Sequence, residues 1–387
     1  MRLATRMERI GTETAFEAPA RARALEATGR EVIHLEIGEP DFDTPRNVSE
    51  AASRALLDDG ATHYTAATGI APLREAIAAD VARWKGISAT PDQVVVTPGA
   101  KPIMFFTMLA LVNEGDEVIY PNPGFPIYES MARYVGGTPV AAPLREANDF
   151  GMDVQEVASL ITDRTRLLVI NSPHNPTGSI LTETDIRRLA ELAVEHDLVV
   201  LADEIYGRLQ YSGSPLSIAT LPGMAERTVT VFSFSKSYGQ AGLRVGYAVG
   251  STGAMLALRK MSHHTVYCVP RAMQLAALLA LQTGADFLAE ARTLYQSVRD
   301  HVHERLSELC LRPEGSTYLF LDLSRFRRPG EEDALGVLDR IADAGVLLAP
   351  GPAFGHDYAS WARLCFTSVE RPALDEALDR ILHVLRS

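Results

Sequence analysis

The chain has 387 residues, of which 47% are hydrophobic and 22% are charged; this composition is typical of a globular protein with a large core or two domains and excludes an intrinsically disordered chain. The formal net charge of −12 argues against nucleic-acid binding, because a protein needs a basic face to neutralise phosphates. Its three cysteines, Cys268, Cys310 and Cys365, lie far apart, so we expect neither a metal site nor a disulfide framework.

The N-terminal residues and the longest apolar runs indicate where in the cell to expect the protein. The first 25 residues contain acids and no unbroken apolar core, which is not typical of a signal peptide. The longest apolar runs, such as residues 272–281, are interrupted by Gln274 and are too short to cross a membrane. We therefore expect a cytoplasmic protein that does not bind a membrane.

Short β-branched runs alternate with longer helical patterns through the middle of the chain. The alternation predicts a largely parallel sheet wrapped by helices, with ligand sites at the carboxyl ends of the strands. The expected strands cover residues 93–97, 117–120, 167–171, 198–202 and 228–232, and the expected helices cover residues 101–112 and 184–196.

The pattern changes after about residue 290. A long amphipathic helix is followed by a strand at 317–322, by Pro/Gly turns and by a last helix. We predict an α/β protein with a large domain over residues 46–289 and a small α+β domain formed by residues 1–45 and 290–387.

Two of the turns that follow predicted strands could bind anions or present an amide. TPGAK, residues 97–101, precedes a helix whose first backbone N–H groups could bind an anion, although such a glycine turn is common. In NSPHNPTG, residues 171–178, two prolines and a glycine fix the turn that presents Asn175. Its amide could donate to a phenolate oxygen and to a carboxylate; the alternative is an ordinary Asn-Pro turn.

LADEIY, residues 201–206, places an acid at the end of an apolar run. Asp203 would be buried there and would need a partner. It could keep a pyridine nitrogen protonated and so make the ring an electron sink, with Tyr206 bonded to the ring's phenolic oxygen. The alternative is an aspartate that caps a helix.

SFSKSYGQAGLRVGY, residues 233–247, follows the strand that ends at residue 232. Lysine is the residue type that condenses with an aldehyde, so Lys236 is a candidate for covalent attachment to an aldehyde. Ser233, Ser235 and Arg244 could supply hydrogen bonds and charge to a phosphate. The alternative is a surface lysine in a Ser/Gly loop.

Taken together, these motifs resemble the fold-type I, class I/II aminotransferase family, also called the aspartate aminotransferase superfamily. The family's S-x-S-K-x-x-x-x-x-G-x-R-x-G-[YW] pattern is matched by residues 233–247, D-E-x-Y by 203–206, N-P-x-G by 175–178 and GEPDF-x-TP by 38–45. The resemblance runs from about Val32 to the C-terminus. It implies the pyridoxal-5′-phosphate (PLP) fold type I and the transfer of an amino group between an L-amino acid and a 2-oxo acid.

The resemblance also implies roles for residues around the cofactor. Lys236 would form the Schiff base with PLP and move the substrate's α-proton, while Asp203 would pair with the pyridine nitrogen and Tyr206 and Asn175 with the ring oxygen. Phe125 would stack on the ring; its alternative is core packing. The phosphate would be bound by Gly99, Ala100, Lys101, Ser233, Ser235 and Arg244.

Further residues are implied to bind substrate or a second subunit. Arg363 aligns with the arginine that binds the substrate α-carboxylate, which a guanidinium does bidentately, although a lone arginine is usually solvated. Gly38 would approach the same carboxylate through its backbone, beside Phe125 and Asn175. Tyr64 matches a tyrosine that reaches the neighbouring subunit's phosphate, which would require a homodimer with a shared active site; the alternative is a local turn tyrosine.

Other functions stay open at this point. The same cofactor also supports elimination, decarboxylation, cyclisation and oxidation, whereas a transcription regulator would need a DNA-binding domain for which the residues before Val32 leave no room. Lys101 matches a lysine that some bacterial aspartate-type members use for the distal carboxylate; the alternative is a solvated residue in the first turn of the helix. The N-terminal stretch lacks the Ser/Thr pattern of those members, and Phe16 could instead line an apolar pocket. We expect a 2-oxoglutarate-linked enzyme of broad or unknown donor, with aspartate as one option.

Overall fold

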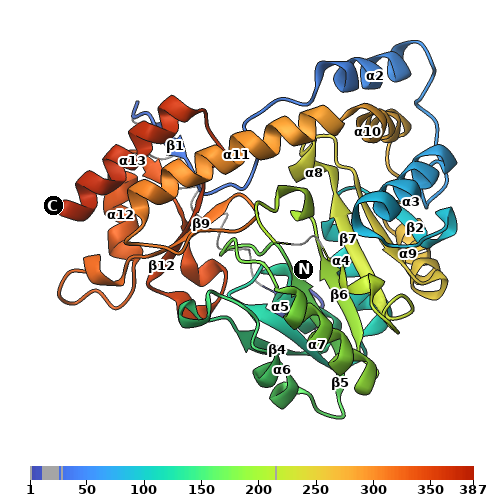
Figure 1. Ribbon diagram of the computed structural model, residues 1–387, viewed down its shortest axis with the longest axis horizontal. Helices are drawn as coiled ribbons and strands as arrows, with labels where there is room; N and C mark the ends of the chain where they lie inside the picture. The colour runs from blue at the N-terminus through green and yellow to red at the C-terminus, as the bar shows by residue number, and fades with distance from the viewer. Residues whose placement is uncertain (1, 11–25, 28, 214–215) are drawn as a thin grey trace.

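The computed structural model describes residues 2–10, 26–27, 29–213 and 216–387 (Figure 1). Phe16, which the sequence suggests for an apolar pocket, lies outside the described residues. Within them, no single helix is long and apolar enough to cross a membrane, and two helices that meet at 80° reach that length and hydropathy only when taken together.

A seven-stranded sheet forms the centre of the molecule. Its strands lie in the order β2-β8-β7-β6-β5-β3-β4, and β8 alone runs antiparallel to its neighbours β2 and β7. The mostly parallel sheet is therefore confirmed. The strands are β2 (Val94–Thr97), β3 (Glu117–Asn122), β4 (Thr138–Pro143), β5 (Thr165–Asn171), β6 (Val199–Asp203), β7 (Thr228–Ser233) and β8 (Gly246–Gly250).

Helices cover both faces of this sheet because alternate strand residues point to opposite sides. Val95 packs with the helices of one face, whereas its neighbours Val94 and Val96 pack with those of the other. One face carries α4 (Lys101–Leu111), α5 (Ile127–Val135) and α9 (Thr252–His264); the other carries α3 (Ala71–Lys85), α6 (Val154–Leu160), α7 (Glu183–Glu195) and α10 (Arg271–Thr283), with α2 (Arg46–Leu57) against α10.

The C-terminal residues form a second unit beside the sheet. Helix α11 (Ala285–Leu306) runs from α10 toward it in Figure 1. A three-stranded antiparallel sheet, β11-β12-β9, is formed by β11 (Ala349–Pro350), β12 (Trp361–Cys365) and β9 (Tyr318–Asp322). It is flanked by α12 (Leu335–Asp343) and α13 (Arg371–Arg386).

The beginning of the chain joins this unit. Strand β1 (Ile33–His34) pairs in parallel with β10 (Val346–Leu347) and lies against α13 (Figure 1). The domain limits at residues 45 and 290 stay a prediction, and position 290 falls inside α11. The short 3₁₀ helices are η1 (Thr5–Arg9), η3 (Pro91–Gln93), η4 (Glu146–Asn148), η5 (Gly207–Leu209), η6 (Ile218–Thr220), η7 (Ser324–Phe326), η8 (Gly351–Ala353) and η9 (His356–Tyr358).

Candidate active site

A cavity of about 240 Å³ lies at the carboxyl edge of the central sheet. Parallel strands end at the same edge, and the register pairs Asn171 at the end of β5 with Asp203 at the end of β6. The cavity is lined by eight of the predicted site residues, Gly38, Lys101, Phe125, Asn175, Asp203, Tyr206, Lys236 and Arg363, and also by Glu36, Ile37, Pro126, Ile205, Tyr318 and Phe354.

Lys236 reaches this cavity from α8 (Phe234–Ser237), the short helix that directly follows β7. Ser233 caps that helix, because its hydroxyl accepts a hydrogen bond from the Ser235 backbone N–H at 3.1 Å. The Lys236 ammonium group donates a hydrogen bond to the carbonyl oxygen of Gly38. The amine therefore meets the N-terminal segment inside the cavity and is not a surface lysine.

Asp203 forms part of the cavity lining and is 1% exposed. The Tyr128 hydroxyl donates to its Oδ2 atom at 2.5 Å, and the Ile205 backbone N–H donates to Oδ1 at 3.3 Å. Burial raises the pKa of Asp203 to about 6, while these two hydrogen bonds lower it. Sequence reasoning missed Tyr128, although it lies three residues after Phe125 and its ring meets that ring edge-on, with the centroids 6.0 Å apart.

Arg363, on β12, is 6% exposed, so the solvated alternative is wrong. Its guanidinium donates to the Asn175 side-chain oxygen at 2.9 Å and to the Glu36 carbonyl at 2.6 Å. The rings of Tyr318 and Phe354 lie 4.3 and 4.7 Å from its central carbon. Both rings therefore lie within cation–π distance of the guanidinium, and the arginine lines the cavity.

The buried side chain of Asn171 holds the turn that carries Asn175. The Asn175 backbone N–H donates to the side-chain oxygen of Asn171 at 2.9 Å, and the Asn171 amide donates to the Asp203 carbonyl at 3.0 Å. Asn171 is buried, so it joins the ends of β5 and β6. These two bonds fix the backbone of the turn at Asn175, and the side-chain oxygen of Asn175 accepts the hydrogen bond from Arg363.

Tyr206 and Tyr318 close another side of the cavity. Their hydroxyl oxygens lie 2.6 Å apart, and burial raises the pKa of Tyr206 above its usual value. A side chain at position 38 would place its Cβ atom 1.8 Å from the Tyr318 hydroxyl, so Tyr318 can occupy its present position only because residue 38 is glycine. Sequence reasoning predicted the strand that carries Tyr318 but not the role of this side chain in the cavity wall.

The predicted anion-binding turn lies at the start of α4. A Cβ atom at Gly99 would lie 2.2 Å from a terminal nitrogen of Arg244, and one at Gly246 would lie 2.5 Å from the Gly99 carbonyl carbon. The two glycines therefore let the arginine and β8 approach the helix N-terminus closely. Arg244 has a φ of 56°, a left-handed conformation that is uncommon for a side chain with a Cβ atom.

Tyr64 lies apart from these groups. Its side chain is 85% exposed and its ring meets that of Tyr267 with the centroids 5.0 Å apart. It does not line the cavity of its own chain.

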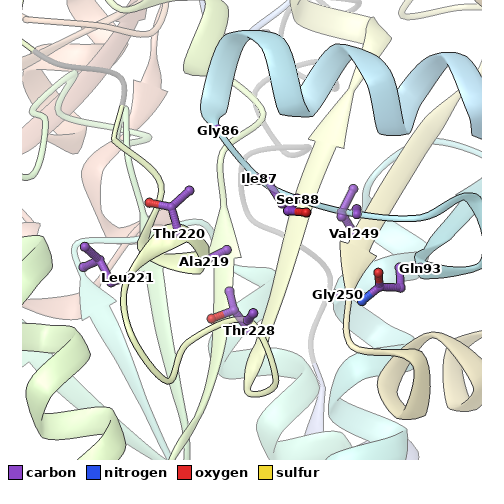
Figure 2. Close-up of a pocket in the computed structure, with 12 residues that line it drawn as sticks. Gly86, Ile87, Ser88, Gln93, Ala219, Thr220, Leu221, Thr228, Val249 and Gly250 are labelled. Carbon is purple, nitrogen blue, oxygen red and sulfur yellow. The ribbon is translucent and has the colours of Figure 1, made fainter.

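A second cavity, of about 180 Å³, lies at the opposite end of the strands (Figure 2). Residues such as Ser88, Gln93, Thr220 and Thr228 line it, and no ionisable side chain is among its lining residues. It therefore lacks the acids and bases that proton transfer requires. In the part of the chain that the structure describes, no three His, Cys, Asp or Glu side chains cluster as metal ligands.

Comparison with known proteins gives a consistent result. Residues 30–381 match the family described as aminotransferase class I and II. A probable aspartate/prephenate aminotransferase of Thermus aquaticus is 37% identical over 393 residues and 99% of both chains. An arginine–pyruvate transaminase of Pseudomonas aeruginosa is 38% identical over 372 residues, which cover 95% of this chain and 93% of that one. The structure of a Thermus thermophilus aspartate aminotransferase with maleate superposes with a TM-score of 0.93, 35% identity and coverage of 99% and 100% of the two chains.

Proposed function

Since the chain belongs to the class I and class II aminotransferase family, we propose that it transfers amino groups through pyridoxal 5′-phosphate bound covalently by Lys236. The observation that carries the proposal is that Lys236 and the buried Asp203 line one cavity. When bound, the cofactor supplies an aldehyde for the amine and a cationic ring that withdraws electrons from the substrate Cα.

The residues around the cavity fit the parts of this cofactor. Asp203 suits the ring nitrogen. Among the residues that the structure describes, no cation lies within ion-pairing distance of this buried carboxylate. A protonated ring would supply the positive charge that the carboxylate needs. Tyr206 and Asn175 suit the ring oxygen, and Phe125 offers an aromatic face.

The phosphate would be bound next to the ring, at the start of α4. The backbone N–H groups of Ala100 and Lys101 at the start of that helix, and of Gly99 in the preceding turn, would bind it together with the Arg244 guanidinium. In the structure, the Gly99 N–H donates to the Thr97 carbonyl at 2.8 Å. Ser233 and Ser235, at the start of α8, add hydroxyl groups. The predicted phosphate set thus combines a helix N-terminus, an arginine and two serines.

Substrate binding and proton transfer follow from the other residues of the cavity. Arg363 would bind the α-carboxylate bidentately, displacing its present bonds to Asn175 or Glu36. That contact would orient the Cα–H bond toward the Lys236 amine, which would take and return the proton.

The distal part of the substrate would meet Lys101. This lysine lines the cavity with its ammonium group 5.4 Å from the centre of the Phe125 ring. A cation there favours a distal carboxylate, which both aspartate and 2-oxoglutarate carry. We propose 2-oxoglutarate as an acceptor and aspartate among the donors; the similar proteins named for prephenate and for arginine make a wider donor range part of the test.

We also propose that the active enzyme is a homodimer. Tyr64 is exposed and sits against Tyr267, next to the partly exposed Val266, so this surface offers aromatic and apolar groups to a second copy. Light scattering should give twice the mass of the chain, and Tyr64→Phe should weaken cofactor binding. A monomer with full activity would refute this part.

The central test combines a single-turnover screen with chemical trapping. Incubation with one amino acid and no oxo acid should release one equivalent of the matching 2-oxo acid; continued turnover with release of ammonia would mean elimination instead. After borohydride reduction, peptide mass analysis should find the pyridoxyl group on Lys236. Lys101→Ala, which changes another lysine of the cavity, should keep the adduct, whereas an adduct formed in Lys236→Ala would refute the proposal.

A further inference from the structure

Next to Asp203 in the sequence lies a second buried acid that the proposed chemistry does not use. Glu204 is 6% exposed. One carboxylate oxygen lies 2.7 Å from the Lys85 ammonium nitrogen, and the other accepts a hydrogen bond from the Ser217 hydroxyl at 2.5 Å. The Lys85 side chain is itself 2% exposed. Two charges taken so far out of water are tolerated only as a pair.

The structure holds Lys85 in place from several sides. It is the last residue of α3, and its ammonium group lies 4.8 Å from the centre of the Trp84 ring. A Cβ atom at Gly207 would lie 3.4 Å from the Lys85 nitrogen and 3.0 Å from Trp84, so glycine allows this close packing. The chain then continues through Gly86 to the second cavity (Figure 2).

The neighbouring charges are already paired with one another. Asp80 forms ion pairs with Arg208 at 2.5 Å and with Arg83 at 2.8 Å. The Arg208 guanidinium also lies over the Trp84 ring, 4.1 Å from its centre. Tyr238 and Tyr247, which pack nearby, are neutral because burial raises their pKa values above the usual range. Lys85 is therefore the cation that compensates Glu204.

Glu204 follows Asp203 directly in the chain, and both side chains are buried. The groups that face Asp203 are Tyr128 from α5, Tyr206 and Glu204 from its own segment, and Lys236 across the cavity. After burial, which is the largest cause, the Glu204 charge also raises the pKa of Asp203. Without a cation at position 85, two adjacent buried carboxyl groups would compete for one negative charge.

We propose that Lys85 is a positioning residue of the active site, which acts through Glu204 to keep Asp203 ionised at neutral pH and ready to receive a protonated cofactor ring. This inference rests on the proposed function, in which Asp203 pairs with the ring nitrogen. Lys85 and Glu204 touch neither the cofactor nor the substrate in this scheme. Their contribution is the protonation state of their neighbour.

The test uses three variants, Lys85→Met, Glu204→Gln and the double variant, and two measurements. The first is the dissociation constant of pyridoxal phosphate as a function of pH, because affinity falls when Asp203 takes up a proton. Lys85→Met should move this acidic limb upward by about one pH unit, which weakens binding about threefold at pH 6.5 and close to tenfold at pH 5.5. Glu204→Gln and the double variant should not show this upward movement. Arg83→Met, on the same helix but paired with Asp80, is the matched control and should resemble the unaltered protein.

The second measurement is the thermal unfolding of the cofactor-free protein across pH, which does not depend on the proposed function. Asp203→Asn is introduced into the unaltered protein and into Lys85→Met, so that the difference in stability within each pair reports Asp203 rather than the separate titration of Glu204. The stability that an ionised Asp203 costs should be lost at higher pH in the Lys85→Met pair than in the unaltered pair. Equal pH dependence in the two pairs would overturn the inference. If the pairs differ as expected but borohydride leaves Lys236 unmodified in the unaltered protein, the proposed function fails and the charge coupling stands.

Discussion

The Tyr128 hydroxyl donates a hydrogen bond to Oδ2 of Asp203 across 2.5 Å, and both side chains are buried. The bond joins α5 to the end of β6 and opposes the effect of burial, which raises the pKa of the carboxyl group to about 6. Because this pKa lies close to neutral pH, the loss of a single hydrogen bond would change the fraction of Asp203 that is ionised.

Removal of this hydroxyl should move the titration upward. Tyr128→Phe takes away a hydrogen bond to a charged acceptor, so the pKa of Asp203 should rise by about one unit. Cofactor affinity should then weaken about threefold at pH 6.5 and change little at pH 8.5, which a fluorescence titration at the two pH values measures. Tyr134→Phe, on the same helix, is the control; an equal loss of affinity at both pH values would contradict the prediction.

Burial of an ionised Asp203 should also cost stability in the cofactor-free protein. Its pKa is about 6 in the folded protein against an ordinary value of 3.8, so its contribution is most favourable below pH 3.8 and is lost as pH rises through 6. The difference corresponds to about 3 kcal/mol at pH 7.5. Asp203→Asn should therefore unfold at a higher temperature than the unaltered protein at pH 7.5, with a smaller gain at pH 4.5.

The same substitution should reduce amino-group transfer, because a neutral amide no longer stabilises the cationic ring. We expect a rate loss of about 100-fold or more, measured by single-turnover release of oxo acid at saturating cofactor. The stability prediction has its own contradicting outcome. If Asp203→Asn were less stable than the unaltered protein at both pH 7.5 and pH 4.5, the aspartate would be required for packing.

The sheet could be predicted because its central strands are buried on both faces and are therefore rich in β-branched residues. Strands β2, β3, β5, β6 and β7 all overlap the predicted ranges. Two strands were missed for physical reasons. In β8, glycines stand at both ends and suggest a turn, and β4 contains two prolines, which an edge strand tolerates.

The site was predictable where its residues follow parallel strands, because those strands end at one edge of the sheet. Asn175, Asp203 and Lys236 were found in this way. Tyr318 was missed because it meets Tyr206 across 112 positions of sequence, and no local pattern reports how the C-terminal sheet packs against the cavity. The same holds for Glu36, whose carbonyl meets Arg363 across 327 positions.

A lysine in place of Arg363 should not restore substrate binding, because it matches the charge of the arginine but not its geometry. Arg363→Lys keeps one positive charge and loses the planar pair of donors that a carboxylate accepts. KM for amino acids and for oxo acids should rise together by about 100-fold, with a smaller change in kcat, as steady-state kinetics would show. Arg325→Lys, at an exposed ion pair with Glu308, should leave both constants unchanged. A rise in KM for substrates with one kind of distal group alone would mean that the arginine reads that group.

A methyl group at position 38 should disturb several contacts at once. In Gly38→Ala the Cβ atom would lie 1.8 Å from the Tyr318 hydroxyl, and Tyr318 both bonds to Tyr206 and packs against Arg363. The carbonyl of Gly38, which accepts a hydrogen bond from Lys236, would shift with it. Because displacements of about 1 Å in a site can cost about 100-fold in rate, kcat/KM should fall by one to two orders of magnitude.

The matched control for this change is Gly253→Ala, where a Cβ atom would meet nothing within 4 Å. Both variants add the same methyl group, so any difference between them reports the packing around position 38 rather than the cost of a larger side chain. Near-normal kinetics in Gly38→Ala would mean that Tyr318 can move aside without loss. In that case the hydroxyl pair of Tyr206 and Tyr318 would contribute nothing to the geometry of the cavity, and the close approach of the N-terminal segment to Lys236 would be incidental to catalysis.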